Sequence, residues 1–326
     1  MNKTISLQTY EPYRKNLLKK NELEKLGKIK SSIAIVDTIK SWVLIIITWA
    51  LVFNYPYWWV KITSVIFIAT QLYALLIIAH DGLHRRLFFS VGANDLWNDV
   101  SILGAIGMIT RLNRINHLRH HQELAMPSDP DRFKYSSSGR STRFEFLLSL
   151  TCIPLLAKAF VNIAFPKLGL NWQKKVTNLD KNKHMHADNY SIRDLLIIAI
   201  WQISLIGGLS FVIGWWAYPV LWVAPLLIAV CCDMLRVFCE HSMVDGDDEA
   251  DFSMRLVSYE ANSLEKIIFS PHNMNHHIAH HLWPSIPYYN LDKAEKLIRP
   301  RVEANSPLVW RSSYFGWICR YMGSLK

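Results

Sequence analysis

Residues Ile62 to His84 read ITSVIFIATQLYALLIIAHDGLH, an apolar run that ends in two histidines. The part from Ile62 to Ala79 contains no charged residue. A helix of about 20 apolar residues crosses a hydrocarbon layer of about 30 Å, so this run has the length of a membrane span. His80 and His84 follow it directly. The sequence therefore predicts a spanning helix that carries a histidine pair at one membrane face.

Three more apolar runs accompany the first: WVLIIITWALVF (Trp42–Phe53), LLIIAIWQISLIGGLSFVIGWW (Leu195–Trp216) and YPVLWVAPLLIAVCCDML (Tyr218–Leu235). Hydrophobic residues make up 51% of the chain and charged residues only 19%, below the roughly one quarter typical of soluble proteins. Such runs are rare in soluble helical cores, which disfavours the alternative of two buried hairpins. We predict an all-α membrane protein with four transmembrane helices in two hairpins, over about 32–55, 58–80, 194–215 and 217–236.

The basic residues predict the orientation. Lys and Arg concentrate at both ends of the chain and between the two hairpins, whereas the turn GWWAYP carries none and the other turn only Lys61. By the positive-inside rule, both termini and the segments 81–193 and 237–295 are expected in the cytoplasm. The predicted division is an arm (1–31), a membrane domain (32–295) and a tail (296–326). The lysine-rich start predicts no signal peptide.

The net charge of +10 indicates that the chain contacts an anionic partner. Its location predicts contact with anionic membrane lipids. The chain has no basic–aromatic motif of the kind that binds nucleic acid, so no nucleic-acid partner is expected. We expect a multi-pass integral membrane protein whose active site faces the cytoplasm.

Two apolar stretches remain, Leu96–Thr110 and Phe146–Phe165. The first is too short to span, and Pro154 and Lys158 interrupt the second. We interpret both as helices that lie in or dip into the membrane interface. Strand signals are weak throughout. The five cysteines show no CxxC spacing and are interpreted as inert apolar residues.

Eleven of the thirteen histidines fall in four short places. They are His80 and His84; His117, His120 and His121; His241; and His272, His276, His277, His280 and His281. The predicted topology puts all four places near the same membrane face, although the histidines played no part in assigning the spans. The other two, His184 and His186, stand in a polar loop and are expected to face solvent.

The spacing within HDGLH, HLRHH and HIAHH suits metal binding. The outer histidines of each motif are four residues apart, and such residues are neighbours about 5–6 Å apart on a helix. Nine imidazoles exceed the roughly four ligands of one zinc ion and suit two ions. Imidazole suits Zn, Cu, Fe and Ni alike, so spacing does not name the metal. We predict a cytoplasmic helical cap with a histidine-rich site for two metals. The candidate ligands are His80, His84, His117, His120, His121, His241, His277, His280 and His281.

The same three motifs resemble the histidine boxes of the membrane fatty acid desaturase superfamily. NMNHHIAHHLWPSIPYYNL (Asn273–Leu291) is similar to that superfamily's last box, and LRVFCEH (Leu235–His241) is similar to its Arg…Glu-His segment. HLRHHQELAMPSDPD resembles its second box with a trailing Asp-Pro-Asp. The resemblance covers about residues 40–295.

This resemblance implies an oxygen-dependent enzyme with two iron ions held by the nine histidines. Some relatives carry an asparagine where this chain has Val237, so one water-mediated contact is expected to be absent. The ligand imidazoles need partners for their other ring nitrogens. The candidate partners are Asp81, Glu240, Asn273, Asn275, His272 and His276. The chain carries no fused electron-transfer domain, so electrons are expected from a separate ferredoxin, or from a b-type cytochrome with its reductase.

The leading functional prediction is desaturation of a lipid acyl chain, with O2 as co-substrate. The same boxes serve carotenoid ketolases and hydroxylases and other lipid hydroxylases, and this alternative stays open. A histidine-rich metal transporter or sensor would place polar residues inside the spans, where Gln202 and Asp233 are nearly alone. The composition therefore disfavours a non-enzymatic role.

Overall fold

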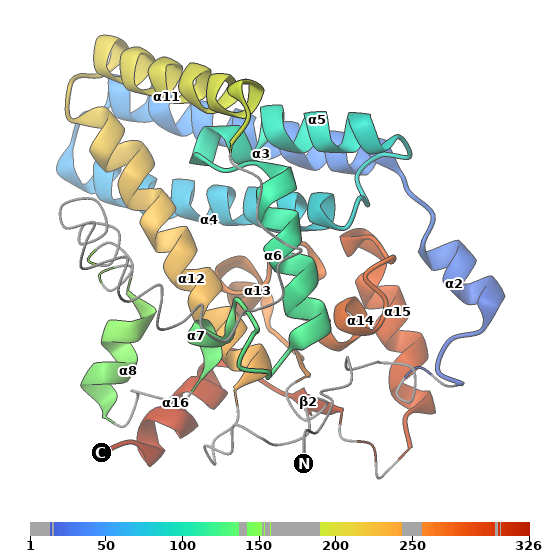
Figure 1. Cartoon of the computed structure of the whole chain (residues 1–326). Helices are drawn as coiled ribbons and strands as arrows, with labels where there is room; N and C mark the ends of the chain where they lie inside the picture. Colours follow the sequence, from blue (N-terminus) through green and yellow to red (C-terminus); the bar gives the residue numbers. More distant parts are fainter. Residues whose placement is uncertain are drawn as a thin grey trace.

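The computed structural model describes residues 14, 16–136, 142–151, 153, 157, 190–242, 256–303, 306 and 308–326. This part of the chain is mostly helical (Figure 1). The longer helices are α3 (Ser31–Asn54), α4 (Trp58–Leu83), α11 (Ile192–Val212) and α12 (Ala224–His241). The shorter helices are α2 (Lys20–Leu26), α5 (Val91–Ser101), η1 (Leu103–Ile106), α6 (Thr110–Glu123), α7 (Arg132–Tyr135), α8 (Arg143–Leu150), η2 (Pro219–Val223), α13 (Ser263–Ile268), η4 (Pro271–Asn273), α14 (His277–Leu282), η5 (Tyr288–Asn290), α15 (Leu291–Ile298), η6 (Arg299–Arg301) and α16 (Tyr314–Ser324).

Four helices are long and apolar enough to cross a membrane, which confirms the predicted number of candidate spans. They cover Lys20–Asn54, Trp58–Leu83, Ile192–Val212 and Pro219–His241. Two of these helices run past their apolar residues, because α4 continues to Leu83 and α12 to His241. Where the apolar segment ends, α4 therefore carries His80 on its last turn, and α12 carries His241.

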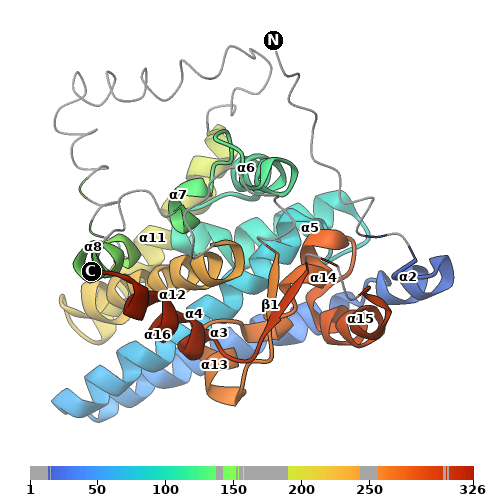
Figure 2. The ribbon, with the colours of Figure 1, turned by 90° about the horizontal axis from the view of Figure 1, so that it is seen from below.

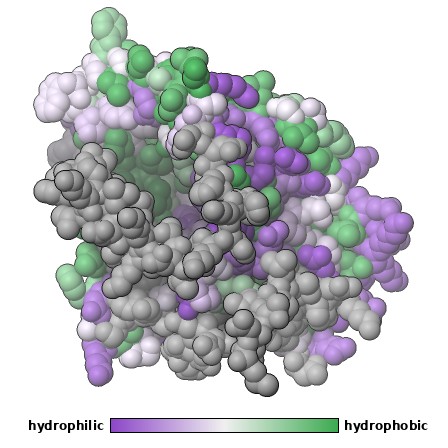
Figure 3. Space-filling model, in the orientation of Figure 1, coloured by the Kyte–Doolittle hydropathy of each residue, from purple (hydrophilic) through white to green (hydrophobic). Residues whose placement is uncertain are grey.

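Several helices expose apolar side chains and bury polar ones, which is the reverse of the pattern in a soluble protein. On α11, Ile203 and Phe211 expose 71% and 93% of their surface. On α5, Asn94 and Asn98 are fully buried, whereas Leu96 is half exposed. Hydrophobic side chains gather over α11 and α5 along the upper edge in Figure 3. Outward apolar and inward polar groups are typical of helices that contact lipid.

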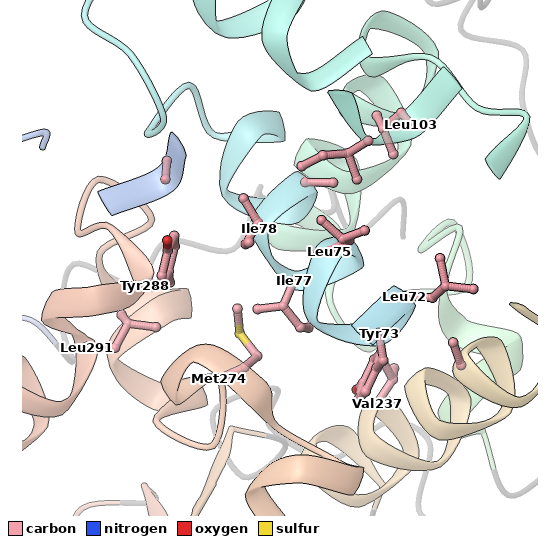
Figure 4. Packing of buried hydrophobic residues seen from close by; sticks show 14 of the residues in the cluster. Leu72, Tyr73, Leu75, Ile77, Ile78, Leu103, Val237, Met274, Tyr288 and Leu291 are labelled. Atoms are coloured by element: carbon pink, nitrogen blue, oxygen red, sulfur yellow. The ribbon is translucent and has the colours of Figure 1, made fainter. Parts of the chain in front are cut away.

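Helix α4 lies at the centre of the molecule and packs against both α3 and α12. Its apolar side chains also contact the C-terminal segment. Figure 4 shows Ile77 and Ile78 of α4 facing Met274, Tyr288 and Leu291. Seen from below, α4 and α12 lie between α6 and α13 (Figure 2). This arrangement brings the histidine-bearing helices together around the ends of α4 and α12.

Two short strands add to the helical fold, although strand signals in the sequence are weak. Strand β1 (Val257–Tyr259) pairs in parallel with β2 (Val309–Arg311), with Ser258 opposite Trp310. Helix α16 packs against α12 through an aromatic cluster that includes Phe146, Phe238 and Tyr321. The C-terminal residues thereby support the end of α12 that carries His241.

Two apolar stretches were predicted to be interface helices, and His184 and His186 were predicted to stand in a polar loop. Helix α5 and η1 cover most of Leu96–Thr110, and α8 covers the start of Phe146–Phe165. The rest of the second stretch lies largely outside the described residues, as do His184 and His186. The burial of Asn94 and Asn98 with Leu96 outward is consistent with the interfacial interpretation of α5.

Candidate metal centre

Four segments far apart in the sequence supply the histidines. Helix α4 ends in the first pair, α6 carries the HLRHH motif, α12 ends at His241, and α14 carries HIAHH. Contacts between residues so far apart in the chain need long-range packing, and the ring centroids of His80 and His280 lie only 4.5 Å apart. The fold therefore gathers imidazoles from all four segments in one place.

The imidazoles form two groups, in each of which one ligand atom per residue lies within 4.8 Å of all the others. The five-histidine group consists of His80, His84, His117, His121 and His280. The three-histidine group consists of His120, His241 and His281. The ninth predicted ligand, His277, adjoins the second group, because its Nε2 atom lies 2.9 Å from Nε2 of His241.

The spacing of the ring nitrogens is that of ligands around a cation. In the five-histidine group, Nε2 of His84 lies 2.7 Å from that of His117, and Nε2 of His121 lies 3.1 Å from those of His117 and His280. Two nitrogens about 2.0–2.1 Å from one ion, at right angles, are about 2.9 Å apart. The nitrogens therefore lie at distances from one another that match the corners of a coordination polyhedron.

Burial keeps the imidazoles in the form that binds metal. Burial and the nearby Arg86 and Arg114 lower the pKa of His84 to about 3. Burial, followed by the neighbouring imidazoles, holds the pKa of His117 and His280 well below the ordinary range. Neutral imidazole is the ligand form, because a proton on the ring nitrogen competes with the metal. These side chains are ready to bind a cation at neutral pH.

A cation would be the common partner of the converging Nε2 atoms, whereas the Nδ1 atoms on the far side of the rings need partners of their own. In the part of the chain that the structure describes, the Nδ1 atoms of His80 and His280 are buried without a hydrogen-bond partner. Stacking so many imidazoles in a protein interior is costly unless their nitrogens are satisfied. Converging and neutral nitrogens fit metal cations, whereas an all-imidazole set leaves the element open.

Two carboxylates lie beside the second group. Glu240 is fully buried, and its Oε2 atom lies 3.2 Å from Nδ1 of His277, although the two are poorly aligned for a hydrogen bond. The same carboxylate pairs with Arg236 at 2.6 Å and accepts a hydrogen bond from the Tyr314 hydroxyl at 2.8 Å. Glu240 was predicted as a partner of a ligand histidine, and the structure places it next to one.

The second carboxylate, Asp129, was not predicted. Its two oxygens lie 3.0 and 3.1 Å from Nδ1 of His120, and its side chain is fully buried. Asp129 belongs to the Asp-Pro-Asp sequence that follows the HLRHH motif. That sequence was a signal of family resemblance, but its nine-residue separation from His120 gave no reason to pair the two.

The other predicted partners contact different groups. Asp81 accepts a hydrogen bond from the Tyr288 amide at 2.7 Å, and Asn273 donates to the Tyr288 carbonyl at 3.4 Å. The ring of His272 packs edge-on against Tyr288. These three side chains therefore surround Tyr288. Their expected role beside a metal ligand stays a prediction.

Asn275 and His276 lie on the other side of the last motif. Asn275 is buried and donates to the Tyr259 carbonyl at 2.8 Å, so it joins the last box to β1. The ring of His276 lies 3.6 Å from Asp292 on α15. Both residues hold the chain around α14 in place, and a contact with a ligand imidazole stays a prediction for them as well.

Comparison with known proteins agrees with this geometry. The family model described as fatty acid desaturase matches residues 56–313, which is most of the chain and includes every histidine of both groups. This chain belongs to the fatty acid desaturase family. It is 27% identical over 256 residues to dihydrorhizobitoxine desaturase of Bradyrhizobium elkanii, over 74% of this chain and 68% of that protein. It is 20% identical over 238 residues to the sn-1 acyl-lipid omega-3 desaturase (ferredoxin) of Nostoc sp. (strain 36), over 71% of this chain and 65% of that protein.

In this member of the family the histidines border a cavity of about 360 Å³. Its walls include Ile77, Met108 and Val237, which are apolar, as well as histidines of both groups. The lining also contains charged side chains that pair with one another: Lys134 lies 3.3 Å from Asp131 and from Asp233, and Asp233 lies 3.0 Å from Arg236. The cavity therefore offers both an apolar surface and ionic groups to a molecule that reaches the histidines.

Proposed function

We propose that this protein is a membrane desaturase that uses O2 and two iron ions to introduce a double bond into a lipid acyl chain. The observation that carries the proposal is the convergence of nine imidazoles from four segments beside one cavity. Family membership supports a desaturase, and the neutral imidazoles support a metal. The choice of iron, of O2 and of an acyl substrate comes from the resemblance of the boxes.

All nine histidines are proposed as ligands. The five-histidine group would hold one ion, and the three-histidine group with His277 would hold the other. When bound, the metals would activate O2, the oxidant, which no amino-acid side chain can do, because an unactivated methylene resists acid–base chemistry. Overall, O2, two electrons and two protons take two hydrogens from adjacent carbons, which leaves a carbon–carbon double bond and two waters.

The chain itself positions the substrate and excludes water. Apolar walls such as Ile77 and Met108 suit a hydrocarbon chain, and a fixed cavity would determine which carbons face the metals. The Lys134–Asp233–Arg236 cluster would contact the polar part of the substrate. Glu240, whose oxygen lies near His277, would hold that imidazole in its ligating orientation.

Two electrons must reach the centre for each double bond. A soluble ferredoxin, or a b-type cytochrome with its reductase, is proposed as the donor, and one relative in this family is named as ferredoxin-dependent. Both termini and the histidines are proposed to lie on the cytoplasmic side of a multi-pass membrane protein, where such donors are found.

The test is product analysis in cells that make the intact protein or its His117→Ala variant. Lipid and pigment extracts are compared by mass spectrometry. The proposal requires new double bonds, seen as a loss of two mass units from an acyl chain, with the wild type alone. An oxygen added to a carotenoid or lipid would reassign the enzyme to the hydroxylases and ketolases. Identical profiles from the two proteins would reject catalysis by this centre.

A further inference from the structure

The surroundings of the two histidine groups differ in charge. Beside the three-histidine group, Asp129 accepts from His120, and Glu240 lies close to His277. In the five-histidine group, the Nδ1 atoms of His80 and His280 have no hydrogen-bond partner among the described residues. In the three-histidine group, His120 therefore has a carboxylate hydrogen-bonded behind its ring. Glu240 lies beside His277 without such a hydrogen bond, and in the five-histidine group His80 and His280 have no such partner among the described residues.

Asp129 is itself held firmly in place. The Tyr135 hydroxyl donates to Oδ2 at 2.5 Å, and the Asp131 amide donates to Oδ1 at 2.8 Å. The Tyr135 oxygen in turn accepts a hydrogen bond from the Ala125 amide at 2.8 Å. Asp129 and Tyr135 are both buried. The carboxylate therefore faces His120 in a fixed orientation, behind the ring and away from the other imidazoles.

This arrangement has a direct consequence for a metal ligand. When Nε2 of His120 binds a metal, its Nδ1 carries the proton and donates it to Asp129. A carboxylate acceptor makes the imidazole a stronger donor to the metal and fixes the ring orientation. Removing such a carboxylate typically weakens metal binding by about 10–100-fold.

We infer that the two metal positions are not equivalent, and that Asp129, through His120, makes the position of the three-histidine group the tighter one. The inference rests on the proposed two-metal function. Asp129 is a positioning residue, since it contacts the ligand and not the metal. The position of the five-histidine group is expected to lose its metal first.

Metal release from the purified full-length holoprotein tests this. An iron chelator is added in steps, and the metal that stays bound is counted for each protein molecule. We expect the wild type to lose one ion at a lower chelator concentration than the other. In Asp129→Asn, which keeps the shape of the side chain, the tighter ion should bind about 10–100-fold more weakly, with the other ion unchanged.

Two further variants sharpen the test. Tyr135→Phe removes one donor to Asp129, so it should weaken the same ion by a smaller factor, and it serves if Asp129→Asn does not fold. Glu123→Gln is the matched control, because Glu123 lies on α6 near His120 but pairs with Arg119 at 2.7 Å. Its two ions should be released as in the wild type.

The outcomes separate the inference from the proposed function. Simultaneous release of both ions from the wild type would overturn the inequivalence and leave the two-metal centre standing. Equal weakening of both ions in Asp129→Asn would overturn the role given to Asp129 and indicate a structural one. Protein that holds no metal at all would overturn the proposed function together with the inference.

Discussion

Burial determines which side chains near the centre carry a charge. Imidazoles of the boxes such as His84, His117 and His280 stay neutral because burial lowers their pKa, and burial also acts on carboxylates elsewhere in the fold. Glu295 on α15 is 6% exposed, and its burial raises its pKa to about 7, although hydrogen bonds from Trp310 and Ser258 oppose this. Such a group links the stability of the fold to pH.

The sign of this effect follows from the raised pKa. The folded protein holds the Glu295 proton more tightly than the unfolded chain does, so the favourable contribution is complete at low pH. It is lost as pH rises from about 4.5 to about 7. Glu295→Gln removes the charge. We expect the variant to be more stable than the wild type at pH 8, by up to about 3 kcal/mol, and similar to it at pH 5.

Thermal unfolding in detergent at the two pH values measures this difference. Asp292→Asn is a suitable control, because Asp292 is a partly exposed neighbour on α15 with a lowered pKa, owing first to its hydrogen bond from Lys296. An equal effect of Glu295→Gln at pH 5 and pH 8 would show that Glu295 does not titrate with folding.

The sequence could predict the histidines of this site but not all their partners. Spacing of four residues on a helix is a local property, so HDGLH, HLRHH and HIAHH indicate their shared faces directly. The contact between Asp129 and His120 depends on a turn in which Ala125 has a φ of +68°. Asp81 was predicted as a partner of a ligand imidazole, and its hydrogen bond from the Tyr288 amide could not be predicted from the sequence. Partners of this kind are fixed by tertiary packing.

Among the elements, the contact between α4 and α5 depends on one glycine of the first box. A Cβ atom added at Gly82 would lie 2.4 Å from the Asn98 side-chain nitrogen, closer than real Cβ contacts. Asn98 is fully buried and donates to the Ala79 carbonyl at 3.1 Å. The glycine in HDGLH therefore lets a polar side chain of α5 hydrogen-bond to the end of α4.

We expect Gly82→Ala to reduce stability by about 1–3 kcal/mol, because the new methyl group displaces Asn98. Gly92→Ala, on α5, is the control, since its nearest neighbour for a new Cβ atom is Ser90 at 3.9 Å. Denaturant titration followed by circular dichroism compares the two. Equal behaviour of the variants would show that α4 and α5 do not need the glycine.

The apolar runs predicted the long helices well, because about 20 consecutive apolar residues have the length and composition of a membrane-spanning helix. Shorter elements were harder to predict. The strands β1 and β2 have three residues each and lie about fifty residues apart in the chain. Their pairing depends on how the intervening helices α13 to α15 pack, and no local sequence pattern encodes that packing. Helix α16 likewise depends on the aromatic residues of α8 and α12.

For the whole molecule, the proposed metals join four segments that lie far apart in the chain. Ligands from α4, α6, α12 and α14 would hold these helices together, and a cation that binds only the folded protein stabilises it. Chelation should therefore lower the thermal midpoint of the purified protein, and added iron should restore it. A midpoint that chelator leaves unchanged would mean that the imidazoles hold no metal in the folded protein.

The number of metal ions in the purified full-length protein tests the two-metal centre most directly. Elemental analysis against protein concentration should give two iron ions for each chain, and His117→Ala, which removes a ligand of the five-histidine group, should retain fewer. A wild-type protein that contains no stoichiometric metal, or a His117→Ala variant with the same content, would contradict a centre built from these nine histidines.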